Sequence, residues 1–168
     1  LDLSRIEEGK LELQRQRFSI NELVNETVQD IVLTNTQHKI KVSHEFYCDV
    51  YGDRDRIGQV LINFVTNAIK YSPESQLIRV DIENTSENEV VVRVKDEGIG
   101  IAESDQKNIF KRFFRIGGEN EETYSGFGIG LYLAKEIIQR HHGRIGVKSE
   151  KGKGSEFAFF MAVANQKQ

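Results

Sequence analysis

Three stretches of the chain repeat apolar residues three and four positions apart, the spacing that places them on one face of an α-helix. In the first, residues 18–33, Ser19 and Glu22 have the spacing of a capping box. The second, residues 54–72, has Asp53 as its expected N-cap and ends before the only proline, Pro73. The third is residues 128–143. The predicted core stripes are Leu23, Val24, Thr27, Val28, Ile31 and Val32; Ile57, Val60, Leu61, Phe64, Val65, Ala68 and Ile69; and Ile129, Leu133, Ile137 and Ile138.

Other segments favour β-strands, being rich in β-branched and aromatic residues. They are residues 40–50, which Tyr51-Gly52 is expected to end, 77–84, 89–97, and a hairpin of 144–150 and 155–163 that turns at 151–154. A short helix is expected at 105–115. Since helices and strands alternate irregularly, we expect an α+β fold, a two-layer α/β sandwich in which about three helices cover one face of a mixed sheet.

Composition narrows the function classes. The net charge of −3, from 23 basic and 26 acidic residues, gives no basic bias toward nucleic acid or an anionic membrane. The single Cys48 excludes an internal disulfide and a cysteine zinc cluster, favours a reducing compartment, and is expected to be half-buried and unreactive. The longest apolar run, residues 157–164, is far shorter than the about 20 residues that cross a bilayer.

The second helix carries polar residues beside its apolar stripe. Asn63, Asn67 and Lys70 fall together, roughly 100° from the centre of the stripe, and should face a groove at its border. Amide oxygens suit Mg²⁺, amide NH₂ groups donate to phosphate oxygens, and a lysine adds positive charge. The alternative is that both amides bridge local backbone, and the helix alone does not decide between the two.

Two glycine-rich segments could approach a nucleotide. "DEGIGI" places Asp96 at a strand end, where a carboxylate can accept a hydrogen bond from an exocyclic amine. "GFGIGL" can expose backbone N–H groups to an anion at a helix start. A plain turn and a glycine-rich helix start are the alternatives. Neither segment is a Walker loop or a strand-turn-helix dinucleotide fingerprint.

Taken in order, these segments resemble the ATP-binding catalytic domain of sensor histidine kinases, in the gyrase-chaperone-kinase ATPase superfamily. "NFVTNAIKYS" is similar to the asparagine box, "DEGIGI" and "GFGIGL" to the two glycine boxes, "IFKRFFR" to the phenylalanine box and "GKGSEF" to the terminal glycine motif. "LDLSRIEEGKLEL" resembles the end of the second dimerisation helix and its linker. The resemblance implies a Bergerat-type ATP-binding fold over nearly the whole chain.

The resemblance also implies roles for single residues. Asn67 with Asn63 would hold Mg²⁺ and the phosphates, and Asp96 would take the adenine amine with Ser155 and a water assisting. Asn63 and Arg115 would be catalytic, with Arg115 near the γ-phosphate. The residues implied to bind ATP are Asn63, Asn67, Lys70, Tyr71, Asp96, Gly98, Gly100, Ile101, Phe110, Gly126, Gly128, Ile129, Gly130, Leu131 and Ser155. Residues 116–125 would form a mobile lid anchored by Phe110 and Phe113.

Related hydrolases carry a glutamate general base where this chain has Asn63, and an amide cannot take a proton from water at neutral pH. Positioning and Mg²⁺ remain available, and phosphoryl transfer relies mostly on these. The four histidines at 38, 44, 141 and 142 lack the helical context of a phosphoacceptor. We therefore expect the acceptor upstream of Leu1, so that this chain binds ATP but does not autophosphorylate alone.

The resemblance implies a kinase domain that phosphorylates a histidine on its own dimerisation hairpin, in a homodimer, for onward transfer to an aspartate of a response-regulator receiver domain. A nucleotide-binding pseudokinase and an ATP hydrolase are the alternatives. The expected organisation is a dimerisation-helix end and linker at 1–16, the catalytic domain at 17–165 and a tail at 166–168. We expect a cytoplasmic location, no nucleic-acid partner and no membrane insertion by this chain.

Overall fold

The computed structural model describes residues 4–5, 9, 11–35, 37–72, 77–114 and 130–165. Its first strand starts before the predicted beginning of the catalytic domain at residue 17. The elements in chain order are β1 (Arg15–Ser19), α2 (Ile20–Thr34), β2 (Lys39–His44), β3 (Asp49–Asp53), α3 (Arg54–Lys70), β4 (Leu77–Ser86), β5 (Glu89–Asp96), α4 (Glu103–Gln106), α5 (Gly130–Arg140), β6 (Arg144–Glu150) and β7 (Gly154–Ala162).

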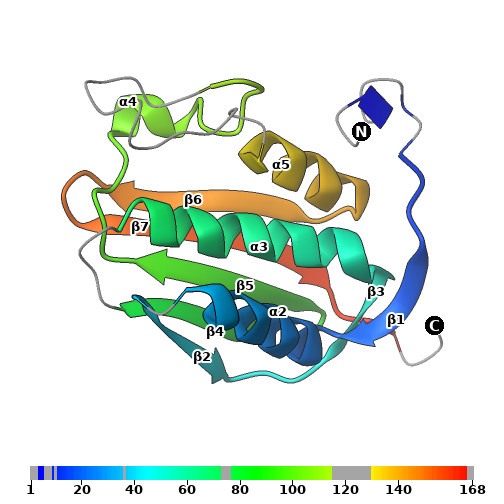
Figure 1. Ribbon diagram of the computed structural model, residues 1–168. Coiled ribbons are helices and arrows are strands. Elements are labelled where there is room, and N and C mark those ends of the chain that lie inside the picture. Colours follow the sequence, from blue (N-terminus) through cyan, green and yellow to red (C-terminus); the bar gives the residue numbers. More distant parts are fainter. Residues whose placement is uncertain are drawn as a thin grey trace.

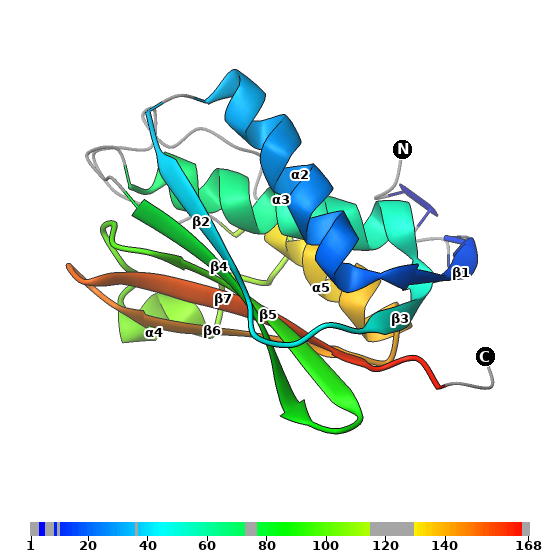
Figure 2. The same ribbon diagram turned by 90° about the horizontal axis from the view of Figure 1, so that it is seen from below.

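The molecule has a helical layer and a sheet layer. Five strands form one sheet in the order β2-β4-β5-β7-β6, and β1 and β3 form a separate antiparallel pair. β2 runs parallel to β4, whereas the other neighbours are antiparallel, so the sheet is mixed. Figures 1 and 2 show α2, α3 and α5 on one face of this sheet. The predicted sandwich is confirmed, as are the strand pair β4–β5 and the hairpin β6–β7.

The apolar stripe of α3 anchors the helix on the sheet. Phe64 is fully buried, with its ring 5.5 Å from that of Phe157 and 6.1 Å from that of Phe159. Burying one such side chain stabilises a fold by about 1.5–3 kcal/mol. The predicted stripe is confirmed, except that Ile69 is only partly buried, and its buried members are Ile57, Val60, Leu61, Phe64, Val65 and Ala68.

Helix α2 begins as predicted, because the Ser19 hydroxyl accepts a hydrogen bond from the N–H of Glu22 at 3.2 Å. The first four members of its predicted stripe are buried. Val32 was expected in the core and is 43% exposed, so that prediction is wrong. The reason is visible in Figure 2, where the last turn of α2 rises away from the sheet.

The strand predicted at residues 40–50 is two strands, β2 and β3, and β3 continues through Gly52. The interruption at residues 45–48 is held by the buried Asn21 of α2. Its amide donates to the carbonyl of Phe46 at 2.8 Å and accepts from the N–H of Cys48 at 3.1 Å. These bonds replace strand pairing, so the chain turns and β3 pairs with β1 instead.

The helix predicted at residues 105–115 is also wrong. Only the single turn α4 is helical, and it lies two residues earlier. Residues 107–113 are turns, and Phe113 has φ of 63°. A right-handed helix cannot pass through that conformation, because L-residues in the left-handed region break the repeating hydrogen bonds.

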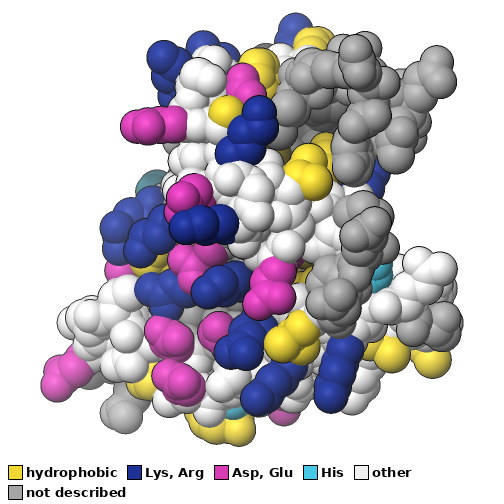
Figure 3. All heavy atoms as spheres, turned by 90° about the vertical axis from the view of Figure 1, so that its left-hand side faces the viewer, with side chains coloured by type: hydrophobic (Ala, Val, Ile, Leu, Met, Phe, Trp, Pro, Cys, Tyr) yellow, Lys and Arg dark blue, Asp and Glu magenta, His cyan; other side chains and the backbone are white. Residues whose placement is uncertain are grey.

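The surface carries both signs of charge. On the face shown in Figure 3, acidic and basic side chains are interspersed, and hydrophobic side chains are scattered among them. In the described part of the chain, no helix is both long and apolar enough to span a membrane. The observed surface matches the balanced charge of the sequence.

Candidate functional site

Asn63, Asn67 and Lys70 lie along one edge of α3. The two amides are half-buried and Lys70 is exposed, whereas Phe64 and Ala68 beside them are buried. Among the described residues, no protein hydrogen bond engages either amide side chain. The predicted border position is confirmed, and the alternative in which both amides bridge local backbone loses support.

The turn after β5 packs against the end of α3. The N–H of Ile99 donates to the carbonyl of Tyr71, the C-cap residue of α3, at 3.1 Å. A β-carbon on Gly98 would lie only 2.0 Å from that carbonyl oxygen. Because no side chain fits there, the glycine lets the turn sit directly on the helix end. The Asp96 turn therefore packs directly against the C-terminal end of the helix that carries the two amides.

The same turn packs on the β6–β7 connection. Gly100 has φ of 68°, and a β-carbon there would lie 2.0 Å from the carbonyl oxygen of Glu150. The N–H of Gly152 donates to the carbonyl of Ile99 at 2.6 Å. Packing against the protein's own backbone thus explains both glycines of the turn, without a ligand.

Asp96 is a buried carboxylate at the end of a strand. It is 4% exposed, and burial raises the pKa of its carboxyl above the usual value. The N–H groups of Gly98 and Ser155 donate to the carboxylate and oppose that rise; the Gly98 bond measures 2.9 Å. Within the described chain no ion pair reaches it. A ligand that brings a further N–H donor would stabilise the ionised form.

Ser149, which the sequence did not single out, is the centre of a hydrogen-bond network beside Asp96. Its hydroxyl donates to the carbonyl of Gly154 and accepts from the N–H of Ile101, both at 2.8 Å. Its only proton is thereby used, so the hydroxyl of Ser155, also 2.8 Å away, must be the donor in the bond between the two serines. Ser155 consequently keeps its oxygen as an acceptor, as a water-mediated contact would require. The sequence offered one signal for Ser149: it is a polar residue on one strand of the predicted hairpin, and Ser155 is on the other strand.

Helix α5 starts against the amide edge of α3. A β-carbon on Gly130 would lie 2.6 Å from Oδ1 of Asn63, so only glycine allows this approach. Leu131 is half-buried and packs against the core, which fixes the first turn of α5. The amide edge of α3 therefore faces the N-terminus of a helix, where unpaired N–H groups favour an anion.

Phe110 and Phe113 lie before the predicted lid in different surroundings. Phe110 is half-buried, and its ring meets that of Phe157 edge-on at 6.3 Å. Phe113 is 54% exposed, and the Arg112 guanidinium lies 4.8 Å from its ring centre. Arg115, Gly126, Gly128, Ile129 and the predicted lid at 116–125 lie outside the described residues.

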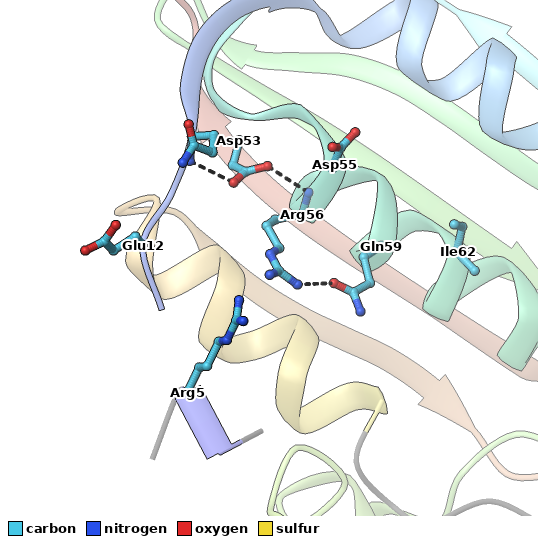
Figure 4. A pocket seen from close by; sticks show the side chains of 8 residues that line it. Arg5, Glu12, Asp53, Asp55, Arg56, Gln59 and Ile62 are labelled. Carbon is cyan, nitrogen blue, oxygen red and sulfur yellow. Dashed lines mark hydrogen bonds between the residues drawn. The ribbon is translucent and has the colours of Figure 1, made fainter. Parts of the chain in front are cut away.

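A separate cavity of about 810 Å³ lies between the N-terminal segment and the first half of α3, as Figure 4 shows. Ile62 borders it and neighbours Asn63 in sequence, but no predicted nucleotide residue in the described ranges lines it. The described residues that line it are Arg5, Glu12, Gln14, Asp53, Asp55, Arg56, Gln59 and Ile62.

His141, the residue after α5, is buried and neutral. Its Nδ1–H donates to the carbonyl of Ile137 at 2.7 Å, and its Nε2 accepts from the N–H of Asp53 at 2.9 Å. Desolvation lowers the pKa of the imidazole. A β-carbon on Gly52 would lie 2.6 Å from the ring, which is why glycine stands inside β3. Protonation would place a hydrogen on Nε2, directly against the N–H of Asp53, and so break this hydrogen bond.

The buried His141 predicts acid sensitivity. Since its folded pKa is lowered, the unfolded chain, whose histidine titrates at about 6.5, binds the proton first as the pH falls. Stability should therefore be fully present above about pH 6.5 and be lost progressively below it. Urea unfolding at several pH values across this range gives the slope of the free energy of unfolding against pH. It is measured for the wild type, for His141→Gln and for the matched exposed-site variant His142→Gln. A pH slope in His141→Gln equal to the wild type would refute this role, and His142→Gln should keep the wild-type slope.

The other candidate groups have ordinary structural roles. His38 is buried, and its Nε2 lies 2.7 Å from the carbonyl oxygen of Ser72. His44 lies in β2, as predicted, between the amides of Asn21 and Asn25. Cys48 is half-buried, as predicted. Burial, with a smaller contribution from Asp49, raises the pKa of its thiol to about 11, which disfavours the reactive thiolate at neutral pH.

The comparisons with known proteins agree with this geometry. Residues 52–165 match the family described as histidine kinase-, DNA gyrase B-, and HSP90-like ATPase. The chain is 37% identical to the adaptive-response sensory kinase SasA of Thermosynechococcus vestitus, over 93% of this chain and 41% of that protein. It is 32% identical to the sensor histidine kinase WalK of Bacillus subtilis, over 100% of this chain and 28% of that protein. The chain thus spans less than half of each of these relatives.

Solved structures give the same fold. The catalytic domain of histidine kinase ThkA is 28% identical, with a TM-score of 0.75, and the match covers 90% of this chain and 99% of that one. Full-length ShkA in complex with AMPPNP has a TM-score of 0.85 at 23% identity, covering 99% of this chain and 35% of that one. At that identity the second likeness supports the fold alone.

Proposed function

The chain belongs to the histidine kinase-, DNA gyrase B-, and HSP90-like ATPase family, and on that premise we propose that it binds ATP with Mg²⁺ and transfers the γ-phosphoryl group to a histidine. The acceptor lies on a helical hairpin of a longer, dimeric protein. An aspartate of a response-regulator receiver domain then receives the phosphoryl group. In this proposal the residues before β1 link to the hairpin, β1 through residue 165 form the catalytic unit and 166–168 are a tail.

The proposed nucleotide lies between the edge of α3, the Asp96 turn and the start of α5. Asp96 accepts the adenine amine, and the acceptor oxygen of Ser155 supports a bridging water. Lys70 pairs with a phosphate. Gly130 and Leu131 begin the helix whose N–H groups face the phosphates. The remaining proposed contacts are Tyr71, Gly98, Gly100, Ile101, Phe110, Gly126, Gly128 and Ile129, with residues 116–125 as the lid.

The side chains of the proposed site include suitable ligands for Mg²⁺. Asn63 and Asn67 offer neutral amide oxygens that no protein group engages in the described chain, and such oxygens suit Mg²⁺. When bound, the ion neutralises charge on the phosphates. Asn63 cannot deprotonate water, so the site favours transfer to an external nucleophile over hydrolysis. Arg115 is the proposed cation near the γ-phosphate.

One observation carries this proposal: the amide edge of α3 meets the start of α5 at Gly130, while the bond from Ile99 to Tyr71 brings the Asp96 turn to the C-terminal end of the same helix. A buried acceptor for a base amine, neutral oxygens for a metal and a helix N-terminus for phosphate thus converge. No other arrangement in the described chain combines these three chemistries.

The test mixes the purified chain with γ-labelled ATP, Mg²⁺ and a separately prepared helical hairpin that carries the acceptor histidine. We expect acid-labile label on the hairpin and none on the chain alone. Nucleotide binding without label on the hairpin would identify a pseudokinase. Steady phosphate release that is independent of the hairpin would identify a hydrolase. Either result would overturn the proposed transfer.

Gly130→Ala should slow phosphoryl transfer without loss of the fold. Alanine raises helix propensity by about 1 kcal/mol over glycine, but the added methyl group would run into Oδ1 of Asn63 and displace that amide. The hairpin assay and thermal unfolding measure the two effects. Gly146→Ala is the matched control, because no atom lies within 4 Å of its added β-carbon. Full transfer activity in Gly130→Ala would contradict the role of this contact.

A further inference from the structure

The N-terminal segment is attached to the domain away from the nucleotide site. The N–H of Gln14 donates to Oδ2 of Asp53 at 2.9 Å, across 39 positions in sequence. A side-chain N–H of Arg15 donates to the carbonyl of Arg140 at 3.0 Å. From Arg15 onward, β1 pairs with β3. The segment therefore contacts both the start of α3 and the end of α5.

Asp53 is where these contacts meet. One carboxylate oxygen, Oδ1, caps α3 by accepting from the N–H of Arg56 at 3.1 Å, and the other holds Gln14. Figure 4 shows both bonds of Asp53, at the edge of the cavity. The N–H of the same residue donates to Nε2 of His141, just after α5. Asp53 is 6% exposed, so water does not readily replace these partners.

The two helices joined at Asp53 also meet at the nucleotide end. α3 and α5 run antiparallel and pack side by side. Gly130, the first residue of α5, lies against Asn63, midway along α3. About 15 Å of helix separates the two points. Since packed interiors transmit displacement rather than absorb it, the spacing of α3 and α5 beside the phosphates depends on how their far ends are held.

We propose that Asp53 is a positioning residue that couples the N-terminal segment to nucleotide binding. The inference rests on the proposed function, because it assigns ATP to the space between α3 and α5. With Gln14 bound, Asp53 holds the helices at the spacing that accepts the nucleotide. When the segment is displaced, that spacing relaxes and affinity falls. Such coupling is reciprocal, so nucleotide must strengthen the Gln14 attachment by the same factor.

Two variants break the Gln14 bond from opposite sides. Asp53→Asn keeps one oxygen for the cap, and asparagine caps helices about as well as aspartate. With that oxygen on the cap, its NH₂ group cannot accept from Gln14 and the Gln14 bond is lost. Gln14→Pro removes the donor N–H and leaves the carboxylate intact. If both act through one bond, their effects should not add in the double variant.

The experiment measures the affinity of the 168-residue chain for a non-hydrolysable ATP analogue with Mg²⁺, and hydrogen exchange at the Gln14 amide with and without the analogue. Each variant should bind about fivefold more weakly or worse, and the double variant no more weakly than the singles. In the wild type, the analogue should slow Gln14 exchange by that same factor. Ser19→Ala is the control, because it removes the cap of α2 and should lower stability without changing affinity.

The coupling would be overturned, with ATP binding left intact, by either of two results. One is an unchanged affinity for the analogue in both variants, and the other is a Gln14 exchange rate that is the same with and without the analogue. An equal loss of affinity in Ser19→Ala would also overturn it, because general destabilisation would then explain the effect. A wild type that binds no nucleotide would instead overturn the proposed function. Should Asp53→Asn not fold, Gln14→Pro carries the same test, because it leaves the cap of α3 in place.

Discussion

Asp96→Ala should weaken adenine-nucleotide binding by about 10- to 100-fold, because a hydrogen bond to a charged acceptor contributes about 1.5–3 kcal/mol. The carboxylate is buried at the end of β5 and receives only two backbone N–H groups in the described chain. Binding measured by calorimetry for ATP should show the loss. Discrimination against GTP, which lacks the exocyclic amine at the same ring position, should fall with it.

The fold should survive that substitution. Because burial raises the folded pKa of Asp96, the sign of the linkage is that its ionised form opposes folding at pH values above that pKa. Replacing Asp96 by alanine therefore removes the unfavourable free energy of burying a charge. It also removes the two hydrogen bonds that backbone N–H groups donate to the carboxylate. Asp81→Ala is the matched control, since Asp81 lies in β4 between the buried Val80 and Ile82 and so faces away from the helices. Unchanged ATP affinity in the Asp96 variant would remove the adenine assignment.

Asn67→Asp should slow phosphoryl transfer to the hairpin by about 10²–10³-fold, the usual effect of losing one electrostatic group at a reacting centre. The replacement has nearly the same shape, so packing at the half-buried edge of α3 changes little. A carboxylate there repels the phosphates and presents a different metal ligand. Single-turnover transfer of labelled phosphate at saturating ATP measures the rate.

The matched control is Thr66→Asp, which places the same charge one residue away on the exposed side of α3. Thr66 is exposed and its hydroxyl donates to the carbonyl of Ile62 at 2.7 Å. Its variant should transfer at close to the wild-type rate, because exposed charges are screened by water and salt. If both variants were equally slow, a general charge effect would replace the specific role of Asn67.

The parts of the site that sequence predicted depend on local rules. The apolar stripe of α3 has the helical period, so the same arithmetic that buried Phe64 placed Asn63 and Asn67 on the border of that stripe. The cap at Asp53 needs only a carboxylate before the first turn. Asp96 follows a clear strand pattern, and its place at the strand end required no tertiary information.

The parts that sequence missed depend on contacts between distant residues. The break at residues 45–48 is made by Asn21, a residue of another helix, so no local pattern marks it. His141 is buried against β3, where its ring accepts from the N–H of Asp53, 88 positions away in sequence. The failed helix at 105–115 has a suitable apolar pattern, but periodicity carries no information on single backbone conformations such as the positive φ of Phe113.

The most direct test of the account is the structure of this chain with a non-hydrolysable ATP analogue and Mg²⁺. We expect the exocyclic amine of the purine within about 3 Å of the Asp96 carboxylate, and the phosphates between Asn67 and the start of α5. A purine seated instead in the cavity beside Arg56 and Gln59, with Asp96 still bonded only to protein, would contradict it.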